Sequence, residues 1–400
     1  MLGAYRVLLE PAGAARLIAS LLIGRLPIGI FGLAIVLLVR EETGSFAAAG
    51  AASAAWAIGA GVLAPIQGRL VDRFGQPRVL VPSTIANAAA VLGVIVCAGE
   101  RGPTWLIALL AFAGGAALPP LGACMRSIWA DLFANDPDAR NTAYTFEGVV
   151  AEAFLIVGPV LTAGLVALVD ARAALLAAIA LSLAGTLGFA TGALTRAWRS
   201  RATRRPKAGA LGSPGMRTLM LAIVPTGVSF GALEVAMPAF AEAHGKDAGF
   251  AGIFLSAMAL GSLVGGVWYG GRAWSSGVVD RFVVLHVLLA VGTLPILLAD
   301  SVPAMIAAMA LAGLALAPSG AAGYLLIDHV APPGTATEAT TWTVTANVAG
   351  AAAGAALAGA IVDRADVTWA LALACGGPLV GALVSVALRR TLRPPAGVRS

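Results

Sequence analysis

A short polar segment between two long apolar runs decides the fold of this chain. It reads Gly68-Arg69-Leu70-Val71-Asp72-Arg73-Phe74-Gly75-Gln76-Pro77-Arg78. The flanking runs, 45–67 and 79–99, consist mainly of apolar and small residues, and each has the length of about 20 residues that a membrane-spanning helix needs. The segment therefore indicates a tight, charged turn between two membrane helices.

The composition extends this interpretation to the whole chain. Of its 400 residues 59% are hydrophobic and 12% are charged, whereas a soluble domain has roughly 25% charged residues. Twelve apolar runs are expected, at about 17–39, 45–67, 79–99, 103–125, 141–168, 173–194, 217–241, 249–270, 280–299, 302–327, 337–362 and 367–388. They lack the alternation of a membrane β-barrel, and the first run is too long for a signal-peptide core. We expect an all-α polytopic membrane protein with twelve transmembrane helices and no cleaved signal.

Basic residues predict the orientation, because Lys and Arg near helix ends stay preferentially in the cytoplasm. Of the 26 basic residues, Arg25 lies within the first run, twenty fall on the side of the two termini, and five fall on the other side: Arg40, Arg101, Arg172, Lys246 and Arg364. Both termini are therefore expected in the cytoplasm of a bacterium, with the protein in its inner (plasma) membrane. The formal charge of +6 thus reflects topology, and no nucleic-acid partner is expected.

The chain is expected to consist of two six-helix halves. The longest polar interruption lies near its midpoint and is rich in arginine. We assign residues 1–194 to the first half, 195–216 to a basic cytoplasmic linker, 217–388 to the second half and 389–400 to a cytoplasmic tail.

An internal repeat supports these halves. Residues 115–123 and 313–321 share the frame Gly-x-Ala-Leu-x-Pro-x-Gly-Ala at an offset of 313 − 115 = 198. The pairs Val169-Asp170 and Val362-Asp363 end the fifth and eleventh runs at a similar offset. Parallel repeats of this kind place a substrate site between the halves, near the middle of the bilayer.

Segment 68–78 resembles the signature loop of the major facilitator superfamily, Gly-x-Leu-x-Asp-Arg-x-Gly followed by basic residues, in the same loop between the second and third helices. It departs from the pattern at Gln76 and Pro77, and Arg78 takes the place of the usual basic residue. The resemblance implies a twelve-helix transporter in which this loop stabilises the outward-facing state. The expected latch comprises Gly68, Asp72, Arg73, Gly75, Arg78, Arg126 and Asp131, and the alternative is a well-packed turn with ordinary interfacial charges. Gly68 and Gly75 are expected to permit close helix approach and a tight turn.

A second, partial resemblance lies in the fifth run. Residues 158–164, Gly-Pro-Val-Leu-Thr-Ala-Gly, are similar to the Gly-Pro-x-x-Gly-Gly element of proton-coupled drug exporters in the superfamily. Gly158 and Pro159 are expected to kink this helix and to admit a close neighbour, as any transporter can use. Pro120 and Pro318, in the two copies of the repeat, are expected to mark further kinks.

Ionisable residues inside the bilayer are functional candidates, because a charge near its centre costs roughly 2.5–3.5 kcal/mol. Arg25, Glu152 and Glu234 lie within the first, fifth and seventh runs. We expect Glu234 or Glu152 to carry a proton and Arg25 to orient substrate, with an Arg25–Glu152 ion pair allowed by their similar depths. The alternative is a structural ion pair that sets helix register. Glu147 is expected to cap a helix start, and His286 to be packed on the lipid side.

Other classes of function lack their chemistry in this sequence. We find no nucleophile with a base, no metal-ligand cluster, no nucleotide-binding Gly-x-x-x-x-Gly-Lys-[Ser/Thr] loop and no filter-like ring of charge. No enzyme activity, cofactor or metal is expected.

The sequence thus predicts a secondary transporter working by alternating access as a monomer, coupled to protons, which exports a hydrophobic or drug-like compound. Uptake of a sugar or metabolite is the alternative, and a transporter fold used as a sensor or scaffold without flux is a third hypothesis. The partners expected are the small-molecule substrate, the proton and the lipid bilayer.

Overall fold

The computed structural model describes residues 2–199, 210–270, 272, 274–332 and 335–393, apart from the side chains of some helical residues, Glu152 among them. These residues form helices and turns, with no strand in the described ranges. The prediction of an all-α membrane fold is confirmed. Eleven described segments are long and apolar enough to cross a membrane, and α7 adds a shorter apolar stretch, Ile156–Leu168.

The first half contains six spans, two of them broken. A 3-10 helix, η1 (Leu2–Leu9), precedes α1 (Ala14–Arg25) and α2 (Ile28–Thr43), which together form the first span. The next elements are α3 (Phe46–Phe74), α4 (Gln76–Gly99), α5 (Thr104–Ala116), α6 (Leu121–Leu132), α7 (Pro137–Leu168) and α8 (Ala171–Ala190). The fourth span breaks between α5 and α6, where Pro119 and Pro120 lack the amide hydrogens that would continue a helix.

The second half repeats this order. After the short helices α9 (Ala193–Ala197) and η2 (Ala210–Gly212) come α10 (Pro214–Ala243), η3 (Ala248–Phe250), α11 (Ala251–Gly270), α12 (Val278–Thr293), η4 (Leu294–Leu298), α13 (Val302–Gly313), α14 (Leu316–Val330), α15 (Ala336–Arg364) and α16 (Val367–Ala387). The tenth span breaks between α13 and α14, beside Pro318. Residues 200–209 of the expected linker lie outside the described residues.

The repeated frame packs in the same way in both halves. Gly115 brings α5 against the backbone carbonyl of Trp56 in α3, and Gly313 brings α13 against that of Met258 in α11. The sequence repeat pairs Asp170 with Asp363, but the two residues have different places in the structure. Asp170 caps α8, and its structural equivalent is Asp366, which caps α16. Asp363 instead lies inside α15.

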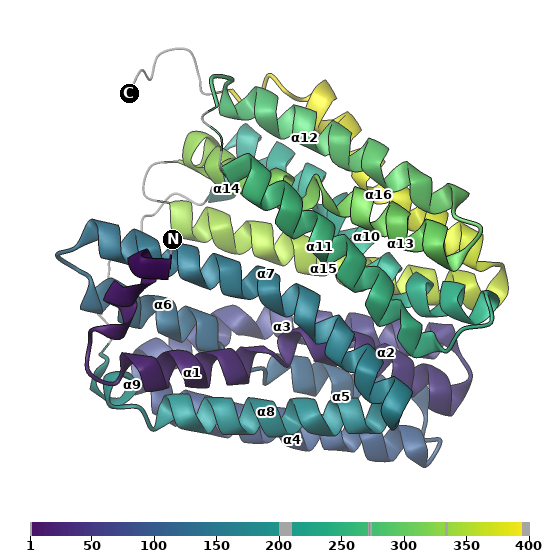
Figure 1. Ribbon diagram of the computed structural model, residues 1–400, viewed down its shortest axis with the longest axis horizontal. Coiled ribbons are helices and arrows are strands. Elements are labelled where there is room, and N and C mark those ends of the chain that lie inside the picture. The colour runs from purple at the N-terminus through teal and green to yellow at the C-terminus, as the bar shows by residue number, and fades with distance from the viewer. Residues whose placement is uncertain (1, 200–209, 271, 273, 333–334, 394–400) are drawn as a thin grey trace.

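The two halves lie side by side, and α1 begins at the same end of the bundle at which α16 ends (Figure 1). We name this the termini end and the other the opposite end. At the termini end each half has a separate apolar core, built around Trp129 in the first half and Phe282 in the second. At the opposite end one core is shared, with Phe31 and Trp56 in the same cluster as Phe240. The halves are therefore joined by apolar packing toward the opposite end.

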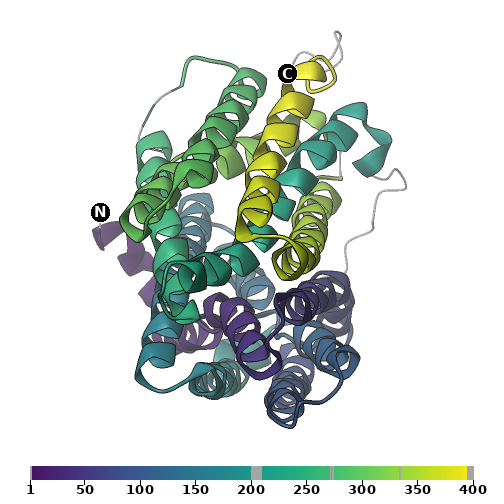
Figure 2. The same cartoon turned by 90° about the vertical axis from the view of Figure 1, so that its right-hand side faces the viewer.

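Two helix pairs make this junction. Figure 2, viewed from the opposite end, shows α15 lying against α3. Gly50 of α3 and Gly359 of α15 each meet backbone of the other helix, so the two helices cross without side chains between them. The second pair is α7 and α11, where the Ser256 hydroxyl donates a hydrogen bond to the Ile156 carbonyl at 3.0 Å.

Candidate transport site

A cavity of about 340 Å³ lies among α10, α12, α14 and α15. Its lining is Ile223, Thr226, Phe230, Phe282, His286, Leu289, Leu316, Ser319, Gly320, Gly323, Tyr324, Ile327, Thr343, Val344, Asn347 and Val348. Most of these side chains are apolar, and no described lining residue is charged. All of them belong to the second half, so this cavity differs from the expected site between the halves.

Three polar residues of this cavity are buried, namely His286, Ser319 and Thr343. The Ser319 hydroxyl has no hydrogen-bond partner among the described residues, and Ser319 is only 4% exposed. His286 is also buried, and its Nδ1 lies 3.1 Å from the Phe282 carbonyl, to which it donates. The expected lipid-side position of His286 is therefore wrong, because the face of α12 that carries it turns toward α14.

Glu234 lies between the halves, one helical turn beyond Phe230 on α10. Its side chain is half-buried, and its Oε2 accepts a hydrogen bond of 3.0 Å from the Ser53 hydroxyl of α3. Gly32 of α2 faces the same carboxylate, and a side chain at Gly32 would collide with it. A half-buried carboxylate at this contact, with one hydroxyl partner, loses hydration when the halves close, and this loss disfavours its charged form.

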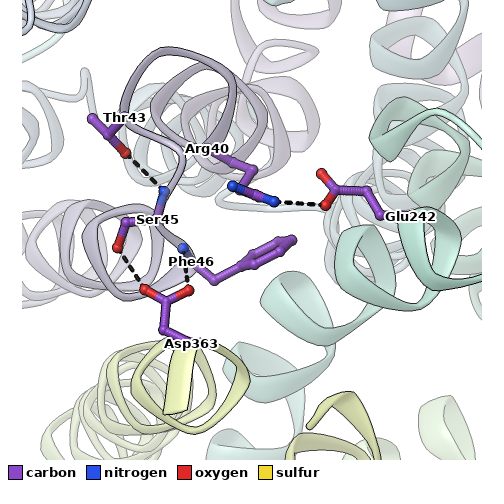
Figure 3. A network of polar contacts seen from close by, with 6 residues as sticks. All are labelled: Arg40, Thr43, Ser45, Phe46, Glu242 and Asp363. Carbon is purple, nitrogen blue, oxygen red and sulfur yellow. Dashed lines mark hydrogen bonds and ion pairs between the residues drawn. The ribbon is translucent and has the colours of Figure 1, made fainter. Parts of the chain in front are cut away.

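Polar contacts join the two halves at the opposite end (Figure 3). Asp363 of α15 accepts hydrogen bonds from the Ser45 hydroxyl at 2.6 Å and from the backbone amides of Phe46 and Ala47 at 2.8 Å. These amides open helix α3, whose N-cap Ser45 accepts a hydrogen bond from the Ala48 amide. One half thus adds a second, acidic cap to the N-terminus of a helix in the other half. Arg40 of α2 adds an ion pair of 2.8 Å with Glu242 of α10. This role of Asp363 could not be predicted from the sequence, because a cap supplied by another element leaves no local sequence signal.

Arg25 pairs with Glu147, and the expected partner Glu152 has a side chain outside the described residues. The Arg25 and Glu147 side chains approach to 3.8 Å, and Arg126 of α6 approaches Glu147 to 3.9 Å. Glu147 is 3% exposed, and neither of its oxygens makes a hydrogen bond among the described residues. It is therefore a buried carboxylate between two guanidinium groups, and the prediction of a helix-capping role is wrong because Glu147 lies more than two turns into α7.

The signature segment forms less of a loop than expected. Helix α3 continues to Phe74 and α4 begins at Gln76, so Gly75 alone makes the turn. Its φ of 87° and ψ of 156° confirm the need for glycine there. A side chain at Gly68 would meet no atom within 4 Å, so the expected close helix approach at Gly68 is wrong.

Gln76 joins this segment to α6. Its buried amide donates to the Cys124 carbonyl and to the Ser127 hydroxyl, both at 3.0 Å, which ties the start of α4 to α6 in the same half. Sequence comparison marked Gln76 only as a departure from the basic pattern. The charged members of the proposed latch, Asp72, Arg73 and Arg78, are exposed at the termini end, and Asp131 is half-buried.

The glycines and prolines that the sequence marks as kink or packing positions lie at helix crossings and at helix breaks. Gly158 of α7 meets the backbone of Gly29 in α2 so closely that neither position has room for a side chain. The carbonyl of Pro159 faces Gly252 of α11 in the other half. Pro120 and Pro318 lie at the breaks of the fourth and tenth spans. No group of three or more His, Cys, Asp or Glu side chains in the described part of the chain is arranged to hold a metal.

The family model of the Major Facilitator Superfamily matches residues 17–296 and 219–400 of this chain. The chain belongs to the major facilitator superfamily. It is therefore a multi-pass membrane protein and a member of a family of small-molecule transporters. A comparison with curated protein sequences gives no significant match.

Solved structures agree on the fold. The nucleoside transporter NupG is similar with a TM-score of 0.73 and 13% identity, over 93% of this chain and 99% of that one. A bacterial homologue of the iron transporter ferroportin, in an inward-facing state, gives a TM-score of 0.69 and 15% identity over 94% and 99%. A bacterial homologue of the human lysosomal transporter Spinster, inward-facing and unoccupied, gives a TM-score of 0.66 and 16% identity, over 97% of this chain and 100% of that one. At these identities the likeness concerns the facilitator fold alone.

Proposed function

We propose that this facilitator is a proton-coupled secondary transporter that exports a small hydrophobic compound across a bacterial inner membrane as a monomer. The observation that carries the proposal is the Glu234 carboxylate, which lies half-buried between the halves and accepts a hydrogen bond from one hydroxyl of the other half. A group in this position links the proton to the conformation.

The orientation follows from the basic residues. Their excess on the side of the termini assigns the termini end to the cytoplasm. The halves share a core only at the opposite end, so we infer that the described state is closed toward the outside and gives access from the cytoplasm. The cavity of the second half lies on the cytoplasmic side of Glu234.

Coupling follows from the position of Glu234 against the other half. With the halves in contact, an ionised Glu234 carboxylate would be partly shielded from water by Gly32 and would keep only the Ser53 hydrogen bond, and desolvation of an ionised group is unfavourable. Ionisation of Glu234 therefore favours separation of α10 from α2 and α3, which hydrates the carboxylate. Reprotonation favours closure, so one proton moves with each cycle.

The direction and substrate are argued from the cavity and the fifth span. The lining is mostly apolar, as a hydrophobic compound requires, and a sugar would need more hydrogen-bonding groups than the six polar residues present: Thr226, His286, Ser319, Tyr324, Thr343 and Asn347. The exporter-like residues Gly158 and Pro159 lie where α7 meets α2 and α11. Both features support export.

The experiment is flux in proteoliposomes under an imposed pH gradient, with a library of small hydrophobic compounds and sugars. We compare the native protein with Glu234→Gln and Glu152→Gln, and use Glu100→Gln as the control because Glu100 is exposed at the opposite end. We expect gradient-driven flux of a hydrophobic compound in the native protein and in Glu100→Gln, with coupling lost in Glu234→Gln.

Three results would contradict parts of this proposal. Unchanged coupling in Glu234→Gln, with loss in Glu152→Gln, would assign the proton to Glu152. Flux without any gradient in all variants would indicate a facilitator, and no flux of any compound would favour a sensor or scaffold. Accumulation of a sugar inside the vesicles would support uptake.

A further inference from the structure

The two halves differ at equivalent positions of the repeated frame, and this difference creates the cavity. With the offset of 198, Ser319 in α14 corresponds to Leu121 in α6. Leu121 is buried and packs against Gly24 of α1. Leu121 is the first residue of α6, whereas α14 begins at Leu316, so Ser319 lies within the first turn of its helix. The Ser319 side chain is smaller, and its hydroxyl has no partner among the described residues.

The neighbouring glycine shows the same contrast. In the first half, the guanidinium group of Arg25 lies over Gly122, 3.1 Å from where a Cβ atom would stand. In the second half, the equivalent Gly320 has no atom within 4 Å of that position. The chain therefore fills this space in the first half with its own Leu121 and Arg25, and leaves it open in the second.

The open space has the chemistry of a binding site for an uncharged molecule. Aromatic side chains reach it from three helices, namely Phe230 of α10, Phe282 of α12 and Tyr324 of α14. None of the described residues around it is charged, so nothing there offsets the desolvation of an ionic ligand. A volume of about 340 Å³ is at the small end of the range for small-molecule pockets.

The polar groups of the cavity supply both kinds of hydrogen-bonding partner. His286 donates through Nδ1 to the Phe282 carbonyl, so Nε2 is the acceptor of the neutral ring. The Asn347 amide can donate and accept, and the buried Ser319 hydroxyl lacks the partner that buried hydroxyls normally have. A neutral amide or a similar group on the ligand matches this set.

We propose that the second half alone binds the transported compound, and that this compound is an uncharged aromatic molecule with an amide-like polar group that hydrogen-bonds Ser319. The proposal rests on the proposed transport function, since it names the substrate class of that function. It implies that the ligand moves with the second half during the transport cycle, while the first half, whose equivalent space is filled, acts as the closing partner.

The test is ligand binding to the full-length protein in detergent, which needs no proton gradient. We use three probes of nearly equal shape and different charge, namely 2-naphthamide, 2-naphthoate and 2-naphthamidine, and measure binding by the ligand-induced rise in melting temperature. We expect 2-naphthamide to bind at least tenfold more tightly than the two ions.

Variants at Ser319 assign the site. Loss of one hydrogen bond in Ser319→Ala should weaken 2-naphthamide binding about fivefold, and Ser319→Leu, which gives the second half the side chain of the first, should abolish it. The matched control is Ser385→Ala, because Ser385 is equally buried but donates to the Gly381 carbonyl at 2.8 Å and does not line the cavity. Ser385→Ala should bind 2-naphthamide as tightly as the native protein.

The melting temperature without ligand shows whether each variant is folded. If Ser319→Leu does not fold, Ser319→Ala alone tests the proposal. Preferential binding of either ion, absence of binding by all three probes, or equal binding by Ser319→Ala and the native protein would each overturn the proposal. Proton coupling would be untouched by these results, because it is measured as flux with Glu234 variants.

Discussion

The Ser53 hydroxyl donates a hydrogen bond of 3.0 Å to the Glu234 carboxylate, and the two residues belong to opposite halves of the molecule. They are 181 residues apart in the sequence. Their contact forms only when the halves are closed at the opposite end, so it reports the conformational state directly.

Removing this hydroxyl should open the opposite end. In Ser53→Ala the half-buried Glu234 carboxylate loses its hydrogen-bond partner, which should destabilise the closed state by about 1–3 kcal/mol. Spin labels at Thr104→Cys and Asp300→Cys, both exposed at the opposite end in different halves, would show a larger population at long distance. The control is Ser182→Ala, whose hydroxyl lies 3.5 Å from Thr84 within the first half. An unchanged distance distribution in Ser53→Ala would contradict the coupling role of this pair.

The two aspartate caps provide a second, matched comparison. Asp363 caps α3 across the halves, whereas Asp366 caps α16 within its own half. Loss of a cap costs about 1 kcal/mol. We therefore expect Asp363→Ala to increase the open population several-fold in the same labelling experiment, and Asp366→Ala to lower the melting temperature without opening. Equal opening by both variants would show that Asp363 has no special part in closure.

The buried pair of Arg25 and Glu147 should matter mainly for stability. Glu147→Leu leaves Arg25 buried without its counter-ion, which should cost about 3–5 kcal/mol. The double variant Arg25→Leu/Glu147→Leu should recover most of the lost melting temperature, because no uncompensated charge remains. Arg126→Ala should change it little, since the Arg126 side chain is 58% exposed. Failure of the double variant to recover would indicate that Arg25 has another buried partner.

The two glycines of the signature segment should respond in opposite directions. Gly75 has a backbone conformation that only glycine adopts readily, so Gly75→Ala should destabilise by about 1–3 kcal/mol. Gly68 lies inside α3 with open space around it, so Gly68→Ala should stabilise the helix by about 0.5–1 kcal/mol. Melting temperatures of the two variants test both expectations. An equal fall in melting temperature in Gly75→Ala and Gly68→Ala would contradict the geometry described.

The candidate site was only partly predictable. Glu234 could be found because an acid in an apolar run is rare and conspicuous, although its partner Ser53 could not. Arg25 was found in the same way, yet its pairing with Glu147 was missed, since depth in the membrane alone does not reveal which helix faces point toward each other. Ser319 and His286 carried no signal, because a serine or histidine in an apolar helix is common and only packing shows whether it lines a cavity.

The membrane class, the helical spans, the two halves and the turn at Gly75 follow from local properties of the chain, because hydrophobic length and backbone preference are expressed within a single segment. Tertiary structure alone decided that α3 is capped by Asp363, that Gln76 ties α4 to α6, and that one half is filled where the other is hollow. These relationships join residues far apart in the chain. Their physical origin is the fit of helix faces in three dimensions, which no single segment contains.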